Sequence, residues 1–246
     1  MSRQSGRLVA SVAFALCASV VAAGCGEKET ESPRSGAAAT PAATATASAT
    51  ATASSSPAPA AALDQALWPP PDQVTNDPLK AARSFVADYI GLEDPQLGPY
   101  QEGEPRAGEI EVFRTGEDGS PLDSILATLS LRQLDGTNWF VTSAQSPEVE
   151  ITAPEPLAEL TTPAGIEGRG RGFEGNIVLE VRSAFETKPL VSKAVIAGSM
   201  ADLEPFDADL TFTAPPGEAS GAIVARTGSG LTSANGFAAF PVAFGP

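Results

Sequence analysis

The sequence contains no histidine and two cysteines, and aromatic residues make up only 6% of it. Without histidine, Ser-His-Asp and Cys-His catalytic sites and imidazole-based zinc sites are excluded. Cys17 lies in an apolar N-terminal run, so removal of that run leaves Cys25 as the one remaining cysteine. An internal disulfide is then excluded as well. Burial of apolar side chains must therefore stabilise the fold.

Basic residues are also scarce. The chain has 15 Lys and Arg against 30 Asp and Glu, a net charge of −15 at pH 7. Two of the basic residues, Arg3 and Arg7, lie in the N-terminal run, which has no acidic residue; the rest of the chain has 15 − 2 = 13 basic and 30 acidic residues, a net charge of −17. This charge argues against a nucleic-acid partner.

Residues 1–24 have the pattern of a secretory signal peptide. Two arginines precede the Ala- and Val-rich run "LVASVAFALCASVVAAG", which ends in small residues. The alternative is a transmembrane helix. The run from Leu8 to Gly24 is only 17 residues long, and no basic stop-transfer cluster follows it. Export is therefore the better prediction.

The end of this segment, "VVAAGC", resembles the lipobox of bacterial lipoproteins. The resemblance implies that Cys25 is diacylated and becomes the new N-terminus. It also implies an extracytoplasmic protein with membrane lipid as a partner. Two acyl chains anchor a protein stably, whereas one is marginal. The alternative is cleavage near Ala23 and release of the protein.

Residues 25–70 are predicted to be a disordered linker. From Ser35 to Ala62 every residue is Ala, Thr, Ser, Pro or Gly, so the segment offers little to bury. Such a segment suits a tether between a membrane anchor and a folded domain.

Residues 75–146 predict a small α+β domain, one helix on an antiparallel sheet. In "NDPLKAARSFVADYIG", Asp77 is the expected N-cap, Pro78 lies in the first turn and Gly91 ends the helix. Strands are expected at 109–115, 124–131 and 138–143, with Asp135-Gly136 as the hairpin turn between the last two.

Residues 147–246 predict an all-β sandwich of about seven short strands, separated by Pro, Gly, Ser and Asn. In the strand "GNIVLEVRS", Ile177, Leu179 and Val181 alternate with Val178 and Glu180. The first set is expected to face a second sheet.

The stretch "GRGFEG", from Gly170 to Gly175, matches a dinucleotide-binding pattern. A β-branched run of period two follows it, not the helix that a phosphate site requires. We therefore predict a tight turn without nucleotide binding, with Phe173 in the core. Arg169 and Arg171 are expected to form exposed pairs with carboxylates such as those of Glu167 or Glu180.

The segment from about Pro147 to Phe244 resembles the Gmad-type immunoglobulin-like domain, the second of the germination-module-associated families in bacteria. The residues that carry the resemblance are Pro163, Gly168 with Gly170, Phe173-Glu174-Gly175, Pro205-Phe206 and Gly221. It implies an extracytoplasmic immunoglobulin-like β-sandwich, often found on lipoproteins. A germination role belongs to spore-forming relatives.

No catalytic, cofactor or metal site is predicted. The acidic residues between 202 and 209 suit a solvated face better than a Ca²⁺ site; they are Asp202, Glu204, Asp207 and Asp209. The favoured hypothesis is a non-enzymatic envelope lipoprotein that binds an unknown envelope protein or wall polymer. One alternative is a small-ligand or lipid carrier with a pocket around Phe85, Tyr89 and Trp139, and another is a carboxylate-based wall hydrolase.

Overall fold

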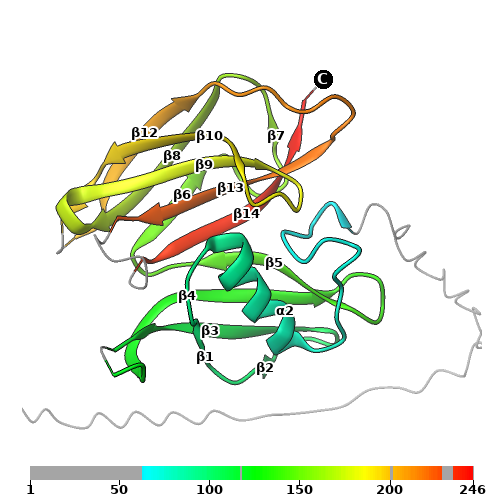
Figure 1. The fold of residues 1–246 in the computed structure, drawn as a ribbon. Coiled ribbons are helices and arrows are strands. Elements are labelled where there is room, and N and C mark those ends of the chain that lie inside the picture. Colours follow the sequence, from blue (N-terminus) through cyan, green and yellow to red (C-terminus); the bar gives the residue numbers. More distant parts are fainter. Residues whose placement is uncertain (1–62, 117, 200–201, 229–234, 246) are drawn as a thin grey trace, which may run out of the picture. The chain divides into compact units, whose positions relative to one another are not determined.

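The computed structural model describes residues 63–116, 118–199, 202–228 and 235–245. They lie within one compact unit, which is mostly antiparallel β-structure with one short helix (Figure 1). The predicted signal peptide, Cys25 and most of the predicted linker fall outside the described residues.

The helix begins where the sequence predicts. The side chain of Asp77 accepts hydrogen bonds from the backbone N–H groups of Leu79 and Lys80 at the start of α2 (Pro78–Ser84). The helix continues as a π-helical turn, η1 (Phe85–Ile90), which the sequence did not predict. It ends at Gly91, whose φ of 81° lies in the left-handed region, as expected for a C-terminal glycine.

Five strands follow the helix: β1 (Gln96–Leu97), β2 (Gln101–Glu102), β3 (Ala107–Thr115), β4 (Pro121–Gln133) and β5 (Trp139–Gln145). The three longer ones confirm the predicted strands: β3 and β4 extend beyond the predicted bounds, and β5 begins at Trp139 and ends at Gln145, where the prediction was 138–143. The predicted hairpin joins β4 to β5, and Gly136 takes the left-handed conformation there with a φ of 87°.

The rest of the chain forms a sandwich, as predicted. Its strands are β6 (Val149–Ala153), β7 (Glu159–Leu160), β8 (Ala164–Gly172), β9 (Asn176–Ser183), β10 (Pro189–Ile196), β11 (Gly198–Ser199), β12 (Glu204–Leu210), β13 (Ser220–Thr227) and β14 (Phe237–Phe244). The strands β6, β8, β11 and β12 form a four-stranded sheet. It packs against β9, β13 and β14 around a core of side chains that includes Ile166, Leu179 and Ile223.

One sheet runs through both predicted modules. Its order is β1-β3-β4-β5-β14-β13-β9-β10, so β14 of the sandwich lies beside β5 (Figure 1). The two strands are paired at Ala239 and Ala144. The α+β module and one layer of the sandwich therefore share a single sheet, where the sequence suggested two separate folds.

Both faces of β9 are buried, which explains how the halves are joined. Ile177, Leu179 and Val181 face the sandwich core, as predicted. The opposite face, which the alternation had suggested was solvated, lies against the helix, and Glu180 is only 3% exposed. Helix side chains such as Phe85 share a second core with Val224 and Phe237 of the sandwich strands.

A buried ionic cluster lies at the C-terminal end of the helix. Both the Nε and one Nη of Arg182 donate to Glu180, at 2.9 and 2.5 Å. Arg226 donates to the other carboxylate oxygen of Glu180 and, at 3.3 Å, to the carbonyl oxygen of Ile90. Arg182 also donates to the carbonyl oxygen of Tyr89. The two arginines thus satisfy carbonyls that the end of the helix leaves without a helical partner.

Tyr89 is enclosed beside this cluster. Its ring lies 4.7 Å from the guanidinium carbon of Arg182, a cation–π distance. Burial raises the pKa of Tyr89 well above its usual value, although the nearby Arg182 opposes the shift. The side chain therefore stays neutral, and the cluster holds the helix against the sandwich strands.

The folded region begins earlier than the predicted linker end at residue 70. The N–H of Leu67 donates to the carbonyl of Val141 at 2.8 Å, and the N–H of Val141 donates to the carbonyl of Trp68 at the same distance. Both Leu67 and Trp68 are buried, and the Trp68 indole donates to the hydroxyl of Ser84 at 2.9 Å. The linker therefore ends earlier than predicted, because Leu67 and Trp68 are large apolar side chains that gain from burial.

The stretch from Gly170 to Gly175 forms the predicted turn. It closes β8, makes one 3₁₀ turn over Phe173–Gly175 and leads into β9. The prediction that Phe173 lies in the core is wrong, because its side chain is 51% exposed. The 3₁₀ turn, in which Glu174 has a φ of 54°, breaks the alternation of the strand and leaves the ring outside.

Gly172 is required by a close backbone approach. A Cβ at this position would lie 2.6 Å from the carbonyl oxygen of Asn176, which accepts a hydrogen bond from Gly228 and cannot move freely. We expect Gly172→Val to lower the free energy of unfolding by about 1–3 kcal/mol. Urea denaturation measures the change.

Gly165 provides the matched control in the same strand. A Cβ there would meet only the Asp209 carboxylate, at an ordinary 3.7 Å. We expect Gly165→Val to change stability by less than about 0.5 kcal/mol. Equal effects of the two substitutions would contradict the assigned close approach at Gly172.

Candidate functional site

The three aromatic residues of the carrier hypothesis are part of the core. Phe85 and Tyr89 stack at a centroid distance of 5.3 Å, and Trp139 meets Tyr100 edge-on at 5.2 Å. Phe85, Tyr89 and Trp139 are at most 8% exposed. They fill the space beneath the helix, so the geometry gives no support for a ligand pocket formed by these rings.

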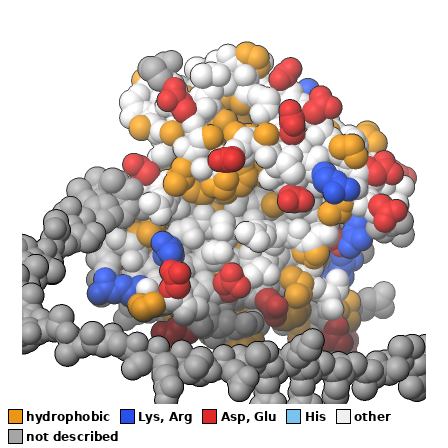
Figure 2. Space-filling view, turned by 180° about the vertical axis from the view of Figure 1, so that it is seen from behind, with side chains coloured by type: hydrophobic (Ala, Val, Ile, Leu, Met, Phe, Trp, Pro, Cys, Tyr) orange, Lys and Arg blue, Asp and Glu red, His pale blue; other side chains and the backbone are white. Residues whose placement is uncertain are grey.

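The acidic residues between 202 and 209 lie on an exposed face. Along β12, Glu204, Asp207 and Asp209 alternate with the buried side chains of Phe206 and Ala208. Within the described residues, no group of three or more Asp, Glu or Cys side chains is arranged to hold a metal ion. Figure 2 shows carboxylate groups scattered over the surface on view.

Arg169, beside the Gly-rich turn, makes a contact different from the carboxylate pair that the sequence predicts. Arg169 donates to the carbonyl oxygen of Leu203 at 3.0 Å, on the loop before β12. Glu180, one of its expected partners, is buried in the cluster with Arg182 and Arg226. Glu180 does not pair with Arg169 because the helix covers the face of β9 that was expected to be open to solvent.

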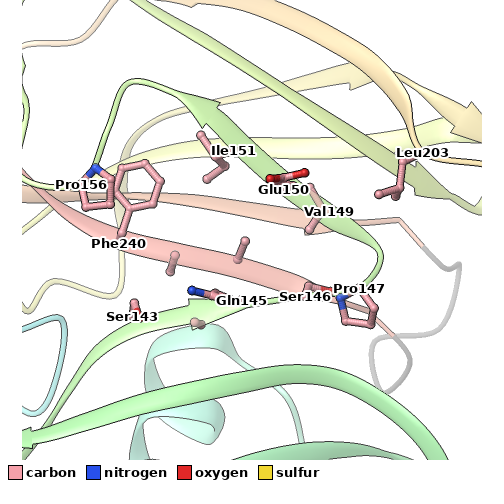
Figure 3. A pocket seen from close by; sticks show the side chains of 13 residues that line it. Ser143, Gln145, Ser146, Pro147, Val149, Glu150, Ile151, Pro156, Leu203 and Phe240 are labelled. Carbon is pink, nitrogen blue, oxygen red and sulfur yellow. The ribbon is translucent and has the colours of Figure 1, made fainter. Parts of the chain in front are cut away.

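A groove of about 450 Å³ lies where β5, β6 and β14 meet. Figure 3 shows Val149, Glu150 and Ile151 on one side, from β6, and Phe240 of β14 opposite them. The β5 end and the connection to β6 form the remaining wall. The residues that line the groove are Ser143, Ala144, Gln145, Ser146, Pro147, Val149, Glu150, Ile151, Pro156, Leu203, Ala238, Ala239 and Phe240.

Two features of the shared sheet create this groove. The four-stranded sheet ends at β6, whereas the larger sheet continues past β14 into β5. In addition, β5 changes partners along its length: Trp139 and Val141 pair with the segment before the helix, and Ala144 pairs with β14. The side chains at the β5 end are therefore left beside the open side of the sandwich.

The lining is mainly apolar, with a few polar groups. Glu150 is the one charged residue among those that line the groove, and its side chain is exposed. Ser143, Gln145 and Ser146 add amide and hydroxyl groups. The hydroxyl of Ser146 already donates to the carbonyl of Leu126 at 2.7 Å. A single carboxylate beside apolar residues suits binding better than acid–base chemistry, which needs two positioned groups.

Sequence reasoning missed this groove because its residues come from three separate segments. The one available signal was Ser146-Pro147, which marks the boundary between the two predicted modules. Such a boundary is a common place for a binding site.

The arrangement of the sandwich agrees with a comparison against protein families. Residues 148–232 match Gmad2, the immunoglobulin-like domain of bacterial spore germination. The Gmad2 match confirms the resemblance stated from the sequence, and it includes β6 and the Gly-rich turn. No curated protein and no solved structure matches the chain.

The Gmad2 segment does not contain the whole groove. It contributes β6 and Leu203, whereas the β5 end precedes it and β14 follows it. The groove is thus formed jointly by the segment that matches Gmad2, the β5 end that precedes it and the strand β14 that follows it.

Among the described residues, none of the helices is both long and apolar enough to cross a membrane.

Proposed function

We propose that this protein is a non-enzymatic binding protein at the outer face of a bacterial cell membrane, with a germination-related role in hosts that form spores. Its acylated Cys25 holds it in the membrane, and residues 26–62 tether the folded part. The groove beside β6 binds a partner protein or a wall polymer.

The match of residues 148–232 to the Gmad2 family carries this proposal, because that family is described as a domain of bacterial spore germination. The site chemistry supports a binding role: the chain has no histidine, and the groove contributes one carboxylate. The strongly acidic composition supports a partner other than nucleic acid.

Deletion of the gene in a spore-forming host tests the germination role. Spores that lack the protein are expected to germinate more slowly, measured as the fall in optical density after a nutrient germinant is added. Expression of the wild-type chain should restore the rate. Unchanged germination of the deletion spores would contradict this part of the proposal and leave the anchoring unaffected.

Cys25→Ser is expected to abolish acylation and to move the protein from the membrane fraction to the medium. Two acyl chains contribute about 0.8 kcal/mol per buried methylene, so their loss removes the anchor. Mass spectrometry of the mature N-terminus and fractionation measure the change. Cys17→Ser is the matched control, because residue 17 lies in the removed segment and should leave anchoring intact. A wild-type protein with an unmodified N-terminus beyond Ala23 would refute lipidation.

A further inference from the structure

The strand beside the groove has a free edge. Within the described residues, β6 pairs with β8 and with no other strand. The N–H of Arg171 donates to the carbonyl of Glu148 at 2.9 Å, so residue 148 faces β8. Backbone groups in an antiparallel ladder point to opposite sides at alternate residues. The N–H and C=O groups of Val149 and the N–H of Ile151, the last residue before the register shift in this ladder, therefore point away from β8, toward the groove.

The space beside this edge has the size and surface of a peptide site. Its volume of about 450 Å³ falls within the range of ligand pockets, about 300–1,000 Å³. Ala238 and Phe240 of β14 provide an apolar floor, and Pro147 and Pro156 lie at its ends. An extended segment in this space would place every second side chain on the apolar floor.

Charge complementarity indicates the chemistry of the occupant. The lining has one charged side chain, the exposed carboxylate of Glu150, and no basic one. The whole chain has twice as many acidic as basic residues. An acidic segment would be repelled, whereas a Lys or Arg beside Glu150 would gain an ion pair.

We infer that the groove binds an extended segment of a partner protein, which adds as a strand to the free edge of β6 and places a Lys or Arg beside Glu150. Hydrogen bonds to Val149 and Ile151 supply affinity, and alternate apolar side chains contact Ala238 and Phe240. This inference deepens the proposed binding function and rests on it. The occupant of the groove is then a basic protein segment and not a wall polymer.

A random heptapeptide display library, selected against the purified protein, tests this inference. The enriched peptides are expected to alternate apolar residues with Lys or Arg, and they are then synthesised. Each peptide is made in two further forms. One form carries N-methyl groups on the backbone nitrogens of the odd-numbered residues, and the other carries them on the even-numbered residues. A bound strand donates to β6 from one register only. One methylated series should therefore lose binding, and the other should retain its Kd within about twofold.

Charge reversal at Glu150 provides the second measurement. Glu150→Lys is expected to weaken binding of the synthetic peptides about five- to tenfold, measured by fluorescence polarisation. Glu186→Lys makes the same change in net charge at an exposed site outside the groove and should leave the Kd unchanged. Both residues are exposed, so both variants should retain the wild-type melting temperature.

Several results would overturn the inference. These are a selection without enrichment, equal tolerance of both methylated series, and equal binding by Glu150→Lys and Glu186→Lys. A protein that dimerises at micromolar concentration, and whose dimer excludes the peptides, would assign the β6 edge to a second copy instead. The wild-type protein could also fail to bind the peptides although it is anchored normally and its deletion slows germination. That result would reject only the basic segment as the partner, and the proposed function would stand.

Discussion

Replacement of Glu180 by alanine should lower the free energy of unfolding by about 3–5 kcal/mol. The change leaves Arg182, which is 3% exposed, buried without its carboxylate partner. Arg226, the second partner of Glu180, keeps more solvent around its side chain, so the greater part of the penalty falls on Arg182. Guanidinium chloride denaturation of the purified protein measures the loss.

The exposed pair between Glu104 and Arg132 is the matched control. These side chains lie 3.2 Å apart but remain 77% and 51% exposed. Glu104→Ala should therefore change stability by less than about 1 kcal/mol. Equal stability of the two alanine variants would show that the cluster at the end of the helix is not a buried network.

A double variant separates the charge from the packing. Glu180→Leu with Arg182→Leu removes both buried charges, so it should cost less than the sum of the two single changes. Part of the loss should remain, because the carbonyl of Tyr89 no longer receives the hydrogen bond from Arg182.

Phe206→Ala should cost about 3–5 kcal/mol, whereas Phe173→Ala should cost less than about 0.5 kcal/mol. Phe206 is 5% exposed and belongs to the sandwich core. A Cβ at Gly168 would come within 2.3 Å of the Phe206 ring, so the ring fills the space above that glycine. Phe173 lies in the exposed turn after β8 and has little contact area to lose.

Thermal melting of the two variants gives the comparison directly. A large loss for Phe173→Ala together with a small one for Phe206→Ala would place the wrong ring in the core. It would also reverse the assignment of inward and outward residues at the end of β8.

Local signals predicted much of the fold. The Asp77 cap, the terminal Gly91 and the Asp-Gly hairpin after β4 act over a few residues, so they are visible in the sequence and appear in the structure. The alternation of Ile177, Leu179 and Val181 is equally local, since side chains in a strand point to opposite faces in turn. These local features were enough to predict the helix, the hairpin and the side of β9 that faces the sandwich core.

Other features depended on contacts between distant segments. The sequence around Glu180 indicates a strand with one polar face, and only the helix, about 90 residues earlier in the chain, makes that face buried. The arginines of "NIVLEVRS" and "GAIVART" gain their roles there as caps for helix carbonyls. The same limitation led to the wrong position of Phe173, because a 3₁₀ turn ended the alternation early.

The sequence by itself determined the composition, the charge, the Cys25 motif and the sandwich strands, because each rests on residue type or on spacing along the chain. Only the tertiary structure decided that β5 and β14 share a sheet and that a groove opens beside β6. A groove is a property of the ends and edges of elements, and its walls come from residues as far apart as Ser143 and Phe240. Pairing between such distant strands depends on the packing of the whole fold, which no local pattern records.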